Sequence, residues 1–153
     1  MQIIRALGRH LDLIVPLFDA YRVFYGQPSD RVGARKFLRK LFTHNASFLF
    51  LAVDYDPSLH AYGFAQLFPT YTSVGMRRSY VLEDLFTAPA LRRHGIATML
   101  LQRAIEFARE SGAGSLYLET AYDNAPAQAL YEKLGWTREE RFYKYNFTIE
   151  TSS

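Results

Sequence analysis

The sequence contains no cysteine and no long apolar run. The lack of cysteine excludes disulfides, thiolate catalysis and zinc–cysteine sites, and it fits a reducing compartment. No apolar segment approaches the about 18 to 20 residues of a membrane-spanning helix. Met1 is not followed by the basic region and apolar core of a signal peptide. We therefore expect a cytoplasmic protein that neither spans nor binds a membrane.

Dense basic blocks and zinc-finger spacings are also missing. The formal net charge is +3 and the pI is near 9.2, but the Lys and Arg residues are scattered along the chain. A modest positive balance serves an anionic cofactor equally well, so we expect no nucleic-acid partner. His10, His44 and His60 lack partners at metal-ligand spacing, so we expect no metal site either.

What is present is the composition of one folded domain. The chain has 153 residues, of which 49% are hydrophobic and 22% charged, a balance typical of globular proteins. Repeats, low-complexity tracts and linker-like stretches are missing from the sequence. We expect a single domain over residues 1–150 and a short tail over residues 151–153.

Hydrophobic periodicity predicts a mixed α/β fold with one sheet. An antiparallel N-terminal half is followed by strand, helix, strand, helix and strand, which implies a parallel crossover. The expected elements are strands at 2–7, 47–54, 61–69, 80–87 and 115–120, helices at 10–25, 31–43, 95–111 and 125–134, and one or two final strands within 136–147.

Two adjacent acids, Glu83 and Asp84, lie inside an apolar strand pattern. Neighbouring residues of a strand point to opposite faces, so one of the two needs a cleft, a bulge or a partner if helices cover both faces. A partly desolvated carboxylate has a raised pKa and suits a general base. The alternative is an ordinary pair of strand-end carboxylates bonded to Arg77 or Arg78.

Eight residues after Asp84, the chain reads Arg92-Arg93-His94-Gly95 before a helical pattern begins. Unpaired amides at a helix N-terminus attract anions, and small residues at Gly95 and Ala97 let a diphosphate approach closely. The alternative is a solvated basic loop. A dinucleotide fold with Glu119 as its ribose-binding acid is disfavoured, because that fold needs more glycines directly after its strand.

These residues resemble the GNAT superfamily of acyl-CoA-dependent N-acetyltransferases. The family pattern Arg/Gln-x-x-Gly-x-Gly/Ala is matched by residues 92–97, and the segment NAPAQALYEKLGW, residues 124–136, is similar to a second family motif. The stretch YVLEDLFTAP is locally similar to the diamine acetyltransferases. The resemblance is strong from about Val81 to Trp136.

The resemblance implies a single-domain GNAT fold with a mixed central sheet of six to seven strands and about four helices. The sheet would splay between the strands at 80–87 and 115–120 to admit acetyl-CoA. The residues implied in binding acetyl-CoA are Leu85, Phe86, Thr87, Arg92, Arg93, His94, Gly95, Ile96, Ala97, Thr98, Asn124 and Tyr131.

The implied reaction is direct attack of a primary amine on acetyl-CoA in a ternary complex. Glu83 is the first candidate for the base and Asp84 the second, while the Tyr131 hydroxyl is placed to protonate the leaving thiolate. Asn124 can instead be only a helix cap, and Tyr131 only a packing residue. The competing class is a module that binds acyl-CoA and senses it without turnover.

The acceptor is expected to be a small amine, polyamine-like or amino-acid-like, or a protein amine. Aromatic residues are candidate walls of its pocket, although core packing is the expected role of most of them: Phe18, Tyr21, Phe24, Tyr25, Phe68 and Tyr71. The oligomeric state is open, with a homodimer as one expectation.

Overall fold

The structure is a computed structural model that describes residues 1–92 and 94–151. These residues form two units, Met1–Glu119 and Thr120–Ser153. The first unit contains the whole sheet and three of the α-helices. The second unit contains the remaining helix and the C-terminal segment.

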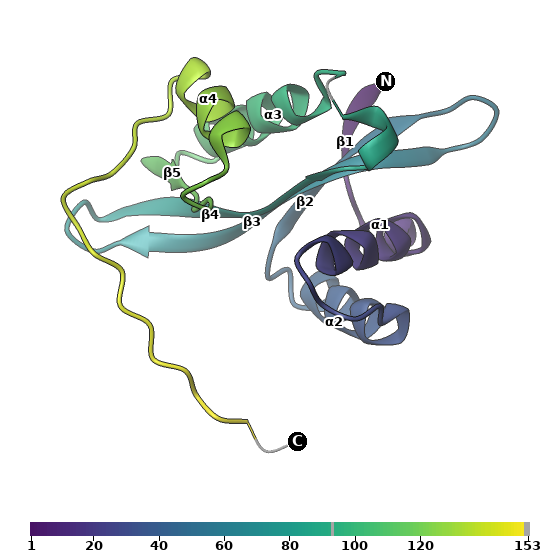
Figure 1. The fold of residues 1–153 in the computed structure, drawn as a ribbon, viewed down its shortest axis with the longest axis horizontal. Coiled ribbons are helices and arrows are strands. Elements are labelled where there is room, and N and C mark those ends of the chain that lie inside the picture. Colours follow the sequence, from purple (N-terminus) through teal and green to yellow (C-terminus); the bar gives the residue numbers. More distant parts are fainter. Residues whose placement is uncertain (93, 152–153) are drawn as a thin grey trace. The chain divides into compact units, whose positions relative to one another are not determined.

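The sheet of the first unit has five strands in the order β1-β2-β3-β4-β5 (Figure 1). Three antiparallel pairings join β1 to β4, and β5 pairs with β4 in parallel, so the sheet is mixed as predicted. The strands are β1 (Gln2–Arg5), β2 (Phe48–Asp54), β3 (His60–Thr72), β4 (Arg77–Thr87) and β5 (Ser115–Tyr117).

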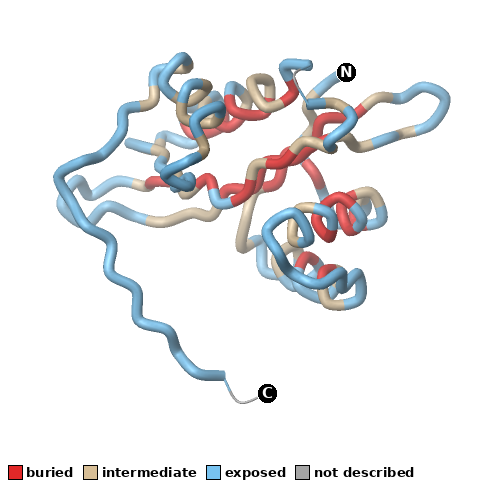
Figure 2. Tube along the Cα trace, viewed as in Figure 1, coloured by how far each residue is buried: buried red, intermediate tan, exposed pale blue. Residues whose placement is uncertain are grey.

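Helices cover both faces of this sheet. The helices α1 (Leu11–Phe24) and α2 (Arg31–Thr43) pack on one face, and α3 (Ile96–Glu110) lies on the other (Figure 1). Because side chains alternate along a strand, Leu49 and Leu51 of β2 join the core under α1 and α2, whereas Phe50 contacts Phe107 of α3. The middle of the sheet is consequently buried from both sides (Figure 2).

The pairing of β4 with β5 is short. It joins Ser79, Tyr80 and Val81 of β4 to the three residues of β5, whereas β4 continues to Thr87. Within the part of the chain that the structure describes, Leu82–Thr87 therefore pairs with β3 on one side only. This free edge lies where the sheet is expected to splay.

The second unit begins with a capped helix, α4 (Ala125–Lys133). The Asn124 side chain accepts a hydrogen bond from the Ala127 amide at 3.3 Å, and proline lies in the first turn. Asn124 is therefore a helix cap, one of the two roles predicted for it, and capping does not conflict with a cofactor contact.

The expected count of six to seven strands is wrong for the described residues, which contain five. The missing strands are those expected within residues 136–147, where apolar residues recur with strand-like spacing. All of residues 137–151 are exposed, and a strand forms only where a neighbour satisfies its amides and carbonyls. Local ion pairs two residues apart, Arg138–Glu140 and Arg141–Glu139, are found here instead.

The other predicted elements are present, with changed ends. The strands β3 and β4 form a hairpin. In it, β3 ends at Thr72 and β4 begins at Arg77, so both strands are longer than the pattern indicated. The strand β5 ends at Tyr117 rather than at Thr120. No described helix combines the length and the apolar character that a membrane span requires.

Candidate active site

A β-bulge separates the two adjacent acids. In the pairing of β3 with β4, Leu67 lies opposite Leu82 and Gln66 lies opposite Asp84, so Glu83 has no residue opposite it. A bulge of this kind turns one side chain out of the normal alternation. Glu83 is exposed, whereas Asp84 is only 7% exposed and lies on the α1 face. The prediction that one acid needs a bulge or a partner is confirmed, since Glu83 has the bulge and Asp84 has partners.

Asp84 is held by two hydrogen-bond donors. The Tyr21 hydroxyl of α1 donates to Asp84 Oδ1 at 2.8 Å, and Gln66 Nε2 of β3 donates to Asp84 Oδ2 at 2.7 Å. The Ser47 hydroxyl donates to Gln66 Oε1 at 2.8 Å, which fixes the orientation of the Gln66 amide. Both oxygens of a buried carboxylate are thus satisfied, as a buried polar group requires.

Burial dominates the electrostatics of this carboxylate. Desolvation raises the pKa of Asp84 above its ordinary value, the hydrogen bonds from Gln66 and Tyr21 oppose that rise, and the charge of Glu83 adds to it. The pKa of the Tyr21 hydroxyl is also raised, first by burial and then by Asp84. Tyr21 therefore stays protonated and donates to Asp84 across the physiological range.

The alternative pairing with Arg77 or Arg78 is wrong for Asp84. Arg78 donates to the Tyr71 hydroxyl, and the Arg77 side chain lies against Gly114. Asp84 uses Tyr21 and Gln66 instead. These partners lie 63 and 18 residues away in the chain, and only the packing of α1 and β3 reveals them.

The residues expected to bind acetyl-CoA in the first unit lie along one path. Leu85, Phe86 and Thr87 follow the acids on the free edge of β4. The chain then passes through a short 3-10 turn (Pro89–Leu91) to α3, whose first residues are Ile96, Ala97 and Thr98. The carboxylates, the free edge and this helix N-terminus are thus successive parts of one polypeptide stretch.

Gly95 begins α3 in a left-handed conformation, with φ 79° and ψ 8°. Such a conformation favours glycine, and among the described residues no heavy atom beyond Gly95 and its chain neighbours lies within 4 Å of the position a Cβ would take. No side-chain hydrogen bond caps this helix in the described residues, so its first amides are available to an anion. These amides suit a diphosphate, and the residues present fit that group.

The basic residues before α3 have different surroundings. Arg92 Nε donates to the Thr87 carbonyl at 3.2 Å, and its guanidinium lies 4.7 Å from the ring centre of Phe24. His94 is exposed, and Arg93 lies outside the described residues. The Arg92 side chain thus connects the loop to aromatic residues of α1.

The second unit holds two predicted site residues, Asn124, which caps α4, and Tyr131 within α4. Its ring centre lies 6.1 Å from that of Trp136. A cofactor contact by Asn124 and an acid role for Tyr131 stay predictions. The described residues contain no group of three or more side chains that could hold a metal ion.

Comparison with known proteins identifies the family. The Acetyltransferase (GNAT) family matches residues 14–136. An uncharacterized N-acetyltransferase of Bacillus subtilis, YhfO, is 38% identical over 136 residues, which cover 89% of each chain. A probable acetyltransferase of Haemophilus influenzae is 31% identical over 121 residues, which cover 79% of this chain and 82% of that protein.

Comparison with solved structures agrees with the sequence comparison. The crystal structure of a probable acetyltransferase superposes with a TM-score of 0.92 and 38% identity, covering 99% of this chain and 100% of the other. A match over most of the chain, by sequence and by fold, agrees with the carboxylates, free edge and uncapped helix N-terminus described above. The chain therefore belongs to the GNAT family of acetyltransferases, and it is an acetyl-transferring enzyme that uses acetyl-CoA.

Proposed function

We propose that this enzyme transfers the acetyl group of acetyl-CoA to a primary amine of a small molecule or a protein, by direct attack in a ternary complex. The observation that carries this proposal is the bulge at Glu83, which presents one carboxylate to solvent directly before the free edge of β4. Without cysteine in the chain, an acyl-Cys intermediate is excluded, so the amine itself attacks the thioester.

Glu83 is the proposed base. An amine attacks only when neutral, and alkyl amines have a pKa near 10.4 in their free state, so a proton must leave before or during attack. Glu83 is exposed and its carboxylate can accept that proton. Asp84 is the second candidate; it is buried and each of its oxygens already accepts a hydrogen bond, so we place it behind the exposed Glu83.

Acetyl-CoA is proposed to lie along the path from the acids to α3. The backbone of Leu85, Phe86 and Thr87 would bind the pantetheine arm as an added strand, and the Leu85 N–H would stabilise the oxyanion. The diphosphate would bind the amides from residue 93 to Thr98, with Gly95 leaving room for its approach. From the second unit, Asn124 would contact the pantetheine arm and Tyr131 would protonate the departing thiolate.

The alternative is a module that binds acetyl-CoA without turning it over. The two are separated by mixing the purified protein with acetyl-CoA and a panel of amines, then following free thiol and N-acetylated product. Amine-dependent release of CoA with matching product supports the enzyme. Tight binding of acetyl-CoA with no product from any amine would favour the sensor.

A further inference from the structure

One residue of β3, Gln66, lies against two residues of β4 at the bulge. Regular pairs enclose the bulge: Leu67–Leu82 on one side and Ala65–Leu85 on the other. These enclosing pairs are the same whether Gln66 is paired with Glu83 or with Asp84, because a bulge sets two residues of one strand against one of the other. The rest of the sheet therefore does not determine which of the two acids is paired and which is the extra residue.

The Gln66 side chain distinguishes the two acids. It is only 1% exposed, and its Nε2 donates to Asp84 Oδ2 at 2.7 Å. The Ser47 hydroxyl donates to Gln66 Oε1 at 2.8 Å, so the amide presents its N–H groups, and not its oxygen, to β4. A buried amide in this orientation stabilises the carboxylate that is paired with it. In this structure that carboxylate is Asp84.

The space under α1 favours the shorter acid at the paired position. Asp84 Oδ1 accepts from the Tyr21 hydroxyl, and the Tyr21 ring contacts the rings of Phe64 and Phe86. Those two rings are buried, with exposures of 0% and 5%. A glutamate side chain is longer than aspartate by one methylene, and a closely packed core accommodates an added methylene poorly. Side-chain length and the two donors thus favour Asp84 over Glu83 at this position.

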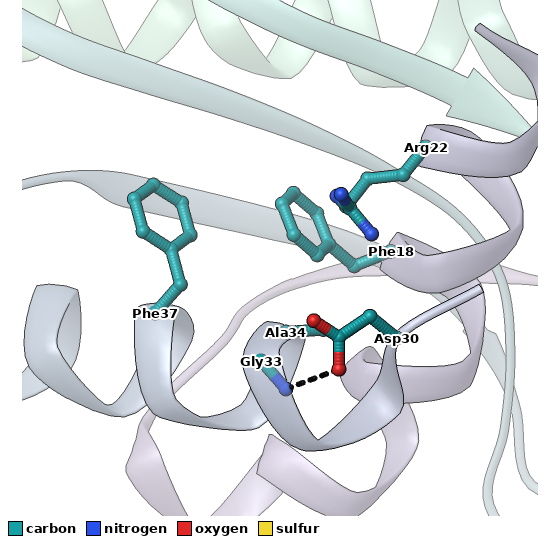
Figure 3. A pocket seen from close by; sticks show the side chains of 6 residues that line it. All are labelled: Phe18, Arg22, Asp30, Gly33, Ala34 and Phe37. Carbon is teal, nitrogen blue, oxygen red and sulfur yellow. Dashed lines mark hydrogen bonds between the residues drawn. The ribbon is translucent and has the colours of Figure 1, made fainter. Parts of the chain in front are cut away.

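These polar groups do not line the hollow that lies between α1 and α2 (Figure 3). That hollow is lined by Phe18, Arg22, Asp30, Gly33, Ala34 and Phe37. The hydrogen bonds given by Ser47, Gln66 and Tyr21 are instead made within the protein, and the two that come from Gln66 and Tyr21 both end on Asp84. The network therefore acts on the acid pair and not on a ligand bound in that hollow.

We propose that Gln66 is a positioning residue that holds Asp84 as the inward acid and so leaves Glu83 exposed as the base. This inference rests on the proposed function and deepens it, because it names the residue that decides which acid works. Without the Gln66 amide, Asp84 keeps a single donor, Tyr21, and its advantage at the paired position shrinks. The two acids then exchange places in part of the molecules, and Asp84 takes over part of the proton removal.

A double-mutant cycle tests this role. Gln66→Met keeps a similar volume and removes the donor. In the wild type, Glu83→Gln is expected to lower kcat about a hundredfold. With Gln66→Met present, the same substitution should cost about threefold less or better, while the penalty of Asp84→Asn should grow. Affinity for acetyl-CoA should stay within about twofold, because the pairs beyond the bulge are kept. An equal penalty for Glu83→Gln in both backgrounds would overturn the inference.

Ser79→Ala is the matched control for loss of a buried hydrogen bond. Ser79 of β4 is also 1% exposed, and its hydroxyl donates to the Ser115 carbonyl at 3.0 Å. Ser79→Ala should cost stability and leave the penalty of Glu83→Gln unchanged. The same change of penalty in both backgrounds would overturn the inference, because a general loss of stability would then explain it. If Gln66→Met does not fold, Ser47→Ala, which frees the Gln66 amide to turn, should lower the penalty of Glu83→Gln in its place.

Thiol labelling reports the position of residue 83 without turnover. The sequence has no cysteine, so Glu83→Cys introduces a single thiol. It should react at least about threefold more slowly with a thiol reagent when Gln66→Met is added, because residue 83 then turns inward in part of the molecules. Val74→Cys, at a fully exposed position, is the control and should react equally fast in both backgrounds.

The labelling result separates the inference from the proposed function. If no amine were acetylated, or if Glu83→Gln were fully active, the proposed function would fail, while the labelling rates would still decide whether Gln66 positions the acids. An unchanged labelling rate at residue 83 on addition of Gln66→Met would overturn the inference and leave the acetyltransferase activity intact.

Discussion

The Tyr21 hydroxyl donates to Asp84 Oδ1 at 2.8 Å and so joins helix α1 to strand β4 across 63 residues of chain. The Tyr21 ring packs against the rings of Tyr25, Phe64 and Phe86, and Asp84 is the neighbour in sequence of the proposed base, Glu83. This hydrogen bond therefore ties the position of α1 to that of the strand that carries both acids. Changes on α1 should reach the acid pair through this contact.

Replacement of Tyr21 by Phe should destabilise the fold. It removes one donor from a buried carboxylate, and a loss of about 1 to 3 kcal/mol in the free energy of unfolding is expected. Urea denaturation measures it. Tyr25→Phe is the control, since Tyr25 lies one turn further along and is 62% exposed. Equal stability of the two variants would mean that the hydrogen bond to Asp84 contributes nothing.

Two buried carboxylates should give stability profiles of opposite sign with pH. The folded state raises the pKa of Asp84, which faces Tyr21, Gln66 and Glu83, so its contribution to stability is full below the unfolded pKa and is lost as pH rises through the folded pKa. The folded state lowers the pKa of Asp19, chiefly through the Ser29 hydroxyl and the Asp30 amide, with Arg31 and Arg22 adding to it. Its contribution is present above the unfolded pKa and is lost as pH falls.

Thermal unfolding between about pH 3 and pH 8 compares the wild type with Asp84→Asn and with Asp19→Asn. The advantage of the wild type over Asp84→Asn should shrink as pH rises from the ordinary Asp pKa. Its advantage over Asp19→Asn should instead grow. An Asn amide offers one acceptor oxygen where the carboxylate offers two, so the slopes and not the offsets carry the result. Parallel slopes would contradict the assigned environments.

Two glycines at opposite ends of α3 separate binding from folding. Gly95 and Gly112 have φ of 79° and 73°, and within the described part of the chain neither has a heavy atom beyond its chain neighbours within 4 Å of the position that a Cβ would take. Gly95→Ala and Gly112→Ala should each lose about 1 to 2 kcal/mol of stability, because an L-residue is strained in this conformation. Only Gly95→Ala should also weaken acetyl-CoA binding, by about tenfold, because its methyl group meets the diphosphate. Calorimetry measures the affinity for acetyl-CoA. Equal affinities of the two variants would contradict the placement of the diphosphate at Gly95.

Much of the fold follows from periodicity in the sequence. The helices and the hairpins have apolar stripes, and glycines mark helix ends at Gly95 and Gly112, so local signals suffice. The count of strands fails because strand formation depends on a partner. Tyr143, Tyr145 and Phe147 alternate as in a strand, but spacing alone does not supply a neighbour.

The candidate site is predictable in part. The adjacency of Glu83 and Asp84 indicates that one of them needs a cleft, a bulge or a partner, but the sequence does not show which. That answer depends on the bulge opposite Gln66 and Leu67, and on donors from α1 and β3. The sequence predicts Tyr21 as a pocket wall or a core residue and gives no role to Gln66 or Ser47, because contacts between distant segments leave no trace in local pattern.

The central claim is that this enzyme acetylates an amine with Glu83 as the base, and the direct test is the pH profile of Glu83→Gln. Free CoA and N-acetylated amine are measured together for the wild type and the variant. The account predicts one acetylated amine for each CoA, and a rate for the variant that is about a hundredfold lower near neutral pH and recovers as rising pH deprotonates the amine. A near-normal rate for the variant with an unchanged pH profile would contradict the role of Glu83.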